Sequence, residues 1–230
     1  MKKEKVVNYV KSKKRLEYKF KHFSVIITDP LPDNVDISYT FKNIESTLPH
    51  HFLNLIDVVY VGDFSFFKER KINAMYADGA MYISNVQDDN RDLKDDIIHE
   101  VSHAVDEKFN DVIYYDNKIK KEYFQKLKKL KNYLIFEKYD LRGINFFNEE
   151  YNKGFDDFLY KEVGYERLRG LIKDLFLSPY SVTSLREYFA VAFEEYFIGN
   201  RIYVKQVSPY VYEKLYFLSN NIEDVTQYES

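Results

Sequence analysis

The 230-residue chain has no cysteine and no tryptophan, only seven glycines and five prolines, and no long apolar run. The lack of cysteine excludes thiol catalysis, disulfide bonds and cysteine-ligated zinc. Because the few glycines and prolines are scattered, without a repeat or a low-complexity tract, we expect a compact chain with no flexible linker. No apolar run approaches the roughly 18 residues of a membrane helix, so no membrane span is expected.

The charge is nearly balanced, with 34 basic and 37 acidic residues. Such a chain has no overall field that would select nucleic acid or an anionic membrane, and nucleic-acid binding is not expected. Residues 2–21 are rich in lysine and arginine, and we expect a helix with a solvated face there. This start lacks the apolar region of a secretory signal, so the sequence as given favours the cytoplasm, or secretion if a leader was removed.

Short β-branched runs come first along the chain, and helical patterns follow. We expect strands at 23–28 and 58–61, and a hairpin of 72–76 with 80–84 across Ala77-Asp78-Gly79. Apolar spacing predicts helices at 37–48, 93–105, 117–137, 165–176, 185–197 and 209–218. This order indicates an α+β fold with a small mixed sheet and a helical C-terminal half. We treat residues 1–57 as an N-terminal segment of unknown role, packed on a domain formed by residues 58–230.

Two of the five histidines lie four residues apart, in His99-Glu100-Val101-Ser102-His103. On a helix, residues i and i+4 share a face, so both imidazoles can bind one metal ion. Glu100 lies about 100° further round the helix, where its carboxylate can reach a water at the metal without being a ligand. The motif predicts a zinc site with Glu100 as general base. The remaining histidines lack partners at this spacing and are expected on the surface or in packing: His22, His50 and His51.

A catalytic zinc ion usually has three protein ligands, and no histidine follows His103. A carboxylate must therefore complete the set. The apolar helix after Ser184 offers Glu187, and its alternatives are Glu194 and Glu195. Glu187 also fits a capping box with Ser184, in which its carboxylate would only satisfy backbone donors. On spacing alone, these two roles of Glu187 are equally supported.

These motifs resemble the peptidase domain of anthrax lethal factor and the related clostridial Pro-Pro endopeptidases. The likeness rests on the His99–His103 motif, on Tyr180 seven residues before Glu187, and on the segments 187–193 and 207–215. It extends over roughly residues 58–220. The resemblance implies a zincin-like metallopeptidase, with one zinc ion held by His99, His103 and Glu187 and a peptide or protein as substrate. It also implies that the Tyr180 hydroxyl stabilises the transition state.

One position departs from that family's pattern. The family often has a second glutamate four residues after the glutamate ligand, and this chain has Val191 there. Any carboxylate that hydrogen-bonds a ligand would then have to come from elsewhere, with Asp106 and Glu194 as the candidates.

Residues 73–76 belong to the predicted hairpin that precedes the motif. This run, Asn73-Ala74-Met75-Tyr76, is similar to the edge strand before the active helix in thermolysin-like zinc peptidases. Because an edge strand has unpaired N–H and C=O groups, an extended peptide can add to it as one more strand. We expect these residues to align the substrate, and an ordinary hairpin strand is the alternative.

The sequence therefore predicts a zinc-dependent endopeptidase. Two alternatives stay open: a non-catalytic relative that binds a partner protein, and an intracellular regulatory zinc peptidase.

Overall fold

The computed structural model describes residues 16–70 and 72–220. The chain divides into two compact units, Met1–Lys108 and Phe109–Ser230. Within the described residues, all five strands belong to the first unit, and the second unit is helical. The α+β class and the small mixed sheet that the sequence predicts are confirmed.

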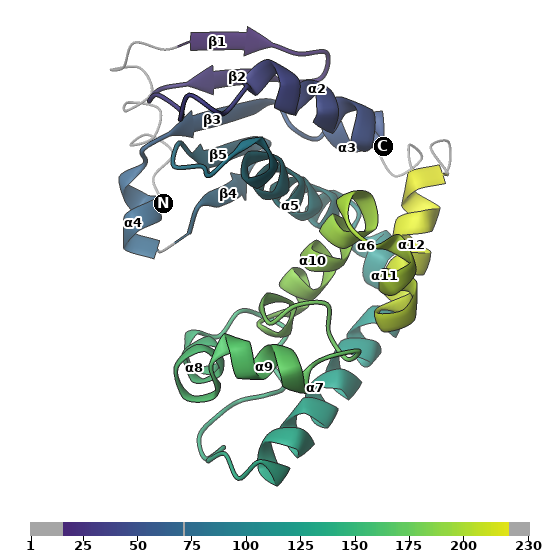
Figure 1. Ribbon diagram of the computed structural model, residues 1–230. Coiled ribbons are helices and arrows are strands. Elements are labelled where there is room, and N and C mark those ends of the chain that lie inside the picture. The colour runs from purple at the N-terminus through teal and green to yellow at the C-terminus, as the bar shows by residue number, and fades with distance from the viewer. Residues whose placement is uncertain (1–15, 71, 221–230) are drawn as a thin grey trace. The chain divides into compact units, whose positions relative to one another are not determined.

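The sheet of the first unit has five strands in the order β1-β2-β3-β5-β4 (Figure 1). Strands β2 (Ser24–Ile27), β3 (Val58–Gly62) and β5 (Ala80–Ser84) are parallel neighbours. Strands β1 (Leu16–Lys19) and β4 (Ala74–Ala77) pair antiparallel at the two edges. β5 is buried along its whole length, which is typical of an inner parallel strand covered on both faces.

The hairpin between β4 and β5 has the connection that its sequence predicts. Ala77 pairs with Ala80, and the two residues between them have positive φ angles, 49° at Asp78 and 78° at Gly79. Positive φ at both central positions is the type I′ turn that Asp-Gly favours. A Cβ at residue 79 would also lie 2.6 Å from a carboxylate oxygen of Asp57, so any other residue would have to displace that side chain.

Among the described residues of the first unit there are four helices: α2 (Ile37–Thr47), α3 (His50–Leu53), α4 (Ser65–Arg70) and α5 (Asn90–Lys108). Helix α5 contacts β4, β5, α2 and α3, and its apolar stripe is buried as its spacing predicts. A separate aromatic cluster forms where Phe64, Phe66 and Phe67 pack against Tyr82 of β5. Helix α5 therefore packs against β4 and β5, at the β4 edge of the sheet.

The second unit consists of short helices around three longer ones. The longer helices are α7 (Lys118–Phe136), α10 (Leu185–Ile198) and α12 (Pro209–Asn220), and each contacts the other two. The shorter elements are α6 (Asn110–Tyr114), α8 (Lys153–Asp157), the π-helical turn η1 (Phe158–Val163), α9 (Tyr165–Leu171), the 3₁₀ turn η2 (Tyr180–Val182) and α11 (Arg201–Val207). Among the described residues, no helix is both long enough and apolar enough to cross a bilayer.

Two sequence predictions are wrong in their secondary structure. The helix expected over residues 2–21 is contradicted at Leu16–Lys19, which form strand β1, and residues 1–15 lie outside the described residues. The helix expected at 165–176 ends at Leu171, although Phe176 beyond it is buried. The chain turns at Asp174, whose φ is 58°. The apolar spacing in the sequence continues past this turn, so it does not mark the end of the helix.

Residues 1–57, where they are described, take part in the sheet of the first unit. They contribute β1 and β2, and β2 pairs with β3 from Ser24 to Ile27. The expected packing of this segment on the rest of the chain therefore takes the form of a shared sheet.

Candidate metal centre

The helix that contains the two-histidine motif begins with a side-chain cap. Asp89 Oδ1 accepts hydrogen bonds from the backbone N–H groups of Arg91 (2.7 Å) and Asp92 (3.0 Å). These bonds, led by the one from Asp92, lower the pKa of the Asp89 carboxyl. The cap and the buried stripe below it fix where α5 starts and which face turns inward.

His99 and His103 lie one turn apart on α5. Their ring centroids are 4.9 Å apart with perpendicular ring planes, and His103 is 7% exposed while His99 is half-buried. Glu100 is buried in the same turn, with 5% exposure. The predicted helical geometry of the motif is therefore present. A buried carboxylate next to two imidazoles is an arrangement that a cation would stabilise.

Polar groups continue along the buried surface of α5. Ser102 is fully buried, and its hydroxyl donates a hydrogen bond to the His99 carbonyl one turn earlier. Asp106, one turn beyond His103, is 9% exposed. Four of the seven residues from Glu100 to Asp106 are thus both polar and buried, on a helix whose other buried residues are apolar.

Glu187 lies in the first turn of α10, directly after the cap. Ser184 is extended (φ −159°, ψ 165°), and its Oγ accepts the Glu187 N–H at 3.1 Å. The backbone of Leu185 is held as well, through its N–H to the Glu149 carbonyl at 2.8 Å. The Ser184 half of the predicted capping box is therefore present, and it fixes the backbone from which the Glu187 side chain extends.

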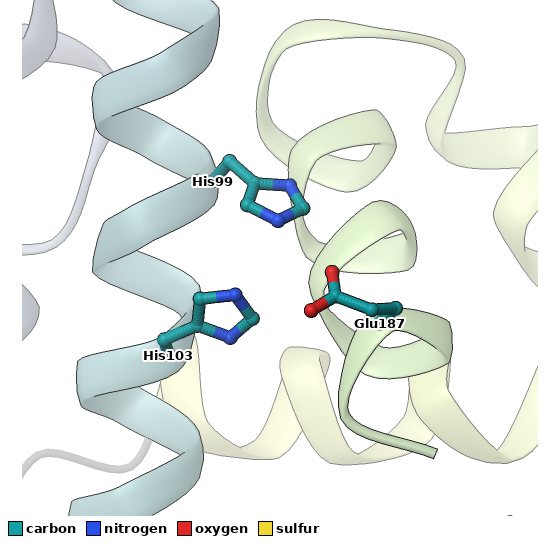
Figure 2. A group of neighbouring side chains, drawn as sticks. All are labelled: His99, His103 and Glu187. Atoms are coloured by element: carbon teal, nitrogen blue, oxygen red, sulfur yellow. The ribbon is translucent and has the colours of Figure 1, made fainter. Parts of the chain in front are cut away.

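One ligand atom each from His99, His103 and Glu187 lies within 4.8 Å of the others (Figure 2). In Figure 2 the Glu187 carboxylate faces the two imidazole rings. The described residues contain no second such group of histidine or acidic side chains, so neither Glu194 nor Glu195 belongs to one. Glu195 instead accepts the Asn200 N–H at 2.9 Å, at the end of α10.

The other histidines take part in local contacts. The rings of His22 and His50 stack at 4.7 Å, and His22 Nδ1 lies 2.6 Å from Asn54 Oδ1. The His51 ring packs edge-on against Phe52 at 4.4 Å. These three histidines therefore take part in local surface and packing contacts, as the sequence predicts.

Tyr180 opens η2, five residues before α10 begins. Its side chain is 41% exposed, and its carbonyl accepts the Thr183 N–H (3.0 Å) and hydroxyl (2.8 Å). The same turn is held by the buried Tyr123 hydroxyl, which donates to the Val182 carbonyl at 2.9 Å. The backbone around Tyr180 is therefore fixed, while its phenol is accessible to solvent.

The expected substrate strand coincides with the edge strand β4. Ala74, Met75 and Tyr76 lie in β4, and Asn73 precedes it, with its carbonyl accepting the Ser84 N–H at 2.7 Å. β4 is the last strand in the sheet order and pairs only with β5 within the described chain. Since β4 also contacts α5, an edge strand lies beside the helix that contains the two-histidine motif.

A buried polar cluster in the second unit was not anticipated from the sequence. Lys126 and Glu122 of α7 are 8% and 7% exposed, and both bond the hydroxyl of the fully buried Tyr188. Burial lowers the pKa of Lys126 to about 8 and raises the pKa of Glu122. In a helix as rich in lysine as α7, no sequence signal distinguishes the one buried lysine from its solvated neighbours.

Comparison with known proteins gives no relatives: no protein-family profile, curated protein or solved structure matches the chain.

Proposed function

We propose that this protein is a zinc-dependent endopeptidase with a zincin-like fold. The observation that carries the proposal is the turn of α5 in which two imidazoles share a face and a buried carboxylate lies between them in sequence. The order of His99, Glu100 and His103 in that turn matches the H-E-x-x-H arrangement of zinc peptidases. The nearby carboxylate of Glu187 supports the proposal further.

The donor set fits zinc in number and in chemistry. Two imidazole nitrogens and one carboxylate oxygen, with a fourth position left for water or substrate, are the ligands of many catalytic zinc sites. Ligand atoms bound tetrahedrally at about 2.0–2.1 Å are roughly 3.3 Å apart. The ligand atoms of these side chains lie within 4.8 Å of one another. Small side-chain rotations would shorten these distances to the value for bound zinc.

A bound zinc ion would supply a water of lowered pKa and would polarise the scissile carbonyl. Glu100 would accept the proton of that water on its carboxylate and pass it to the leaving amine. The Tyr180 hydroxyl would donate a hydrogen bond to the oxygen on which negative charge develops. Its partial exposure leaves the phenol accessible for that role.

The proposed substrate is an extended peptide or a protein segment. Within the described residues β4 is the outermost strand of the sheet, and residues 73–76 would align such a segment as an additional strand. Main-chain pairing of this kind binds a peptide with little regard to its side chains, so sequence preference would come from other contacts.

The test is digestion of a mixed peptide library, with the products identified by mass spectrometry. We expect internal cleavages by the zinc-loaded protein, loss of cleavage after treatment with a chelator, and recovery on adding zinc. A protein that binds zinc but cleaves none of the library would support the non-catalytic, partner-binding alternative. Cleavage that persists in the chelated protein would contradict the metal mechanism.

A further inference from the structure

Helix α10 holds its proposed zinc ligand next to a residue that is anchored on another face of the helix. Glu187 and Tyr188 are consecutive, so their side chains leave the helix about 100° apart. Tyr188 is fully buried, and its phenol lies over the α7 face that contains Glu122 and Lys126. Whatever fixes the rotation of α10 about its axis at Tyr188 also fixes the direction of Glu187.

The Tyr188 hydroxyl is bonded on both sides. It accepts from Lys126 Nζ at 2.6 Å and donates to Glu122 Oε1 at 2.6 Å. Lys126 Nζ also donates to the carbonyl of Val207 and, at 3.4 Å, to the Ser208 hydroxyl, where α11 ends and α12 begins. The second Glu122 oxygen accepts the Tyr210 N–H at 3.5 Å. One phenol thus joins α10 to α7 and to the α11–α12 junction.

Because these hydrogen bonds are directional, they can hold α10 in the one orientation that a metal site needs. A buried ionic cluster adds little net stability compared with apolar side chains of the same volume. Its donors and acceptors, however, accept only one placement of the phenol. A carboxylate about 6 Å from a helix axis moves roughly 2 Å when the helix turns by about 20°. Metal–ligand distances tolerate only about 0.2 Å, so the rotation of α10 has to be fixed.

We propose that Glu122, Lys126 and Tyr188 are positioning residues, which act through the rotation of α10 to hold Glu187 in place for zinc. None of the three is a ligand or a catalytic residue. The inference rests on the proposed function, because it presumes that Glu187 binds zinc. Groups that hydrogen-bond a metal ligand directly change metal affinity by about 10- to 100-fold when they are removed, and for residues that act through the rotation of a helix we expect the lower end of that range.

A second tyrosine provides a matched control. Tyr123 is also fully buried on α7 and also makes a hydroxyl bond across to the α10 region, but its partner is the Val182 carbonyl in η2. Tyr123→Phe and Tyr188→Phe each remove one buried phenol hydroxyl. Only Tyr188→Phe removes a bond made by a residue of α10.

The experiment measures zinc affinity of the full chain by competition with a chromophoric chelator, and thermal unfolding of the metal-free protein. We expect Tyr188→Phe to weaken zinc binding by about 10-fold or more, and Tyr123→Phe to change it less than about threefold, with similar losses of thermal stability. Equal effects of the two variants on zinc affinity, or no effect of Tyr188→Phe, would overturn the proposal.

A pair of variants at Glu122 keeps the proposal testable if Tyr188→Phe does not fold. Glu122→Gln retains an oxygen that accepts the phenol hydrogen bond, whereas Glu122→Met does not. We expect zinc affinity close to that of the parent for Glu122→Gln and about 10-fold weaker binding for Glu122→Met. Equal affinities in the two variants would contradict the positioning role. Parent protein that binds no zinc would overturn the proposed function as well, so the two failures are distinguishable.

Discussion

The two longest helices of the described chain, α5 and α7, each have 19 residues and each bury charged side chains. They differ in which charged residues are buried together. On α7 a buried lysine lies four residues after a buried glutamate, and Tyr188 bonds both. On α5 the buried residues include Glu100, His103 and Asp106 but no lysine or arginine. α7 thus buries a lysine beside its glutamate, whereas the buried residues of α5 include no such cation.

We interpret the α7 cluster as structural, and we propose that the α5 motif binds a metal ion. Charges that compensate each other within a packed unit specify how helices fit together. Two imidazoles and a carboxylate at the spacing of the α5 motif are groups that a metal ion can join. We therefore expect substitutions of the motif residues on α5 to change chemistry with little effect on folding. Substitutions of Glu122 and Lys126 on α7 should lower stability and, through the rotation of α10, zinc affinity.

The largest effect is expected from Glu100→Gln. This change removes the proton acceptor but keeps the size of the side chain, so kcat/KM should fall by about 100- to 10,000-fold while zinc affinity is retained. Peptide cleavage and zinc titration measure the two quantities. Glu107→Gln, an exposed position on the same helix, is the control and should cleave like the parent. Equal rates for Glu100→Gln and the parent would remove Glu100 from the mechanism.

On α7, breaking the charge pair should destabilise the fold. Lys126→Met leaves the buried Glu122 carboxylate without its cation, and we expect the free energy of unfolding to fall by about 3–5 kcal/mol. The double variant Lys126→Met/Glu122→Met removes both charges and should recover much of that loss. Urea unfolding of the metal-free proteins measures the coupling between the two positions. Additive losses would show that the two charges do not compensate each other.

Tyr180 extends the comparison to the tyrosines of the second unit. Tyr123 and Tyr188 are fully buried, while Tyr180 is 41% exposed. Tyr180→Phe should therefore leave the unfolding free energy within about 0.5 kcal/mol. It should lower kcat by about 100-fold, more than it changes KM, because the lost hydrogen bond forms in the transition state. A change confined to KM would instead place Tyr180 in substrate binding.

The smallest effect concerns pH. Burial lowers the pKa of Lys126 to about 8 from 10.5, with Glu122 opposing that shift and Lys129 adding to it. Between these values the unfolded chain binds more protons at this site than the folded one, so the unfolding free energy rises with pH. From about pH 8 to 10 the contribution is about 2 kcal/mol. Unfolding curves of the parent should show this rise relative to Lys126→Met, and parallel pH profiles would contradict it.

The sequence predicts best those features that depend on residues close together in the chain. The two histidines can be identified because a helix brings residues four apart onto one face, and the Asp78-Gly79 turn because its backbone angles favour those residues. Glu187 is harder to assign, since its spacing from Ser184 fits a cap equally well. Part of that cap is present, and the carboxylate lies near the imidazoles as well.

Other features depend on partners that are distant in the sequence. Leu16–Lys19 form a strand because they pair with β2, and a short, charged run contains no sign of that pairing. Phe176 continues an apolar pattern beyond the end of α9, because burial does not require the helix to continue. Lys126 is joined to Tyr188, 62 positions later, so its burial becomes evident only in the folded chain.

Zinc binding by the parent and by single-ligand variants tests the central claim most directly. Metal-free protein is titrated with zinc, and the stoichiometry and affinity are measured. The account predicts one zinc ion per chain, with binding strongly weakened in His103→Ala and in Glu187→Ala but retained in Glu194→Ala. A parent protein that binds no zinc, or a Glu187→Ala variant that binds it as tightly as the parent, would contradict the account.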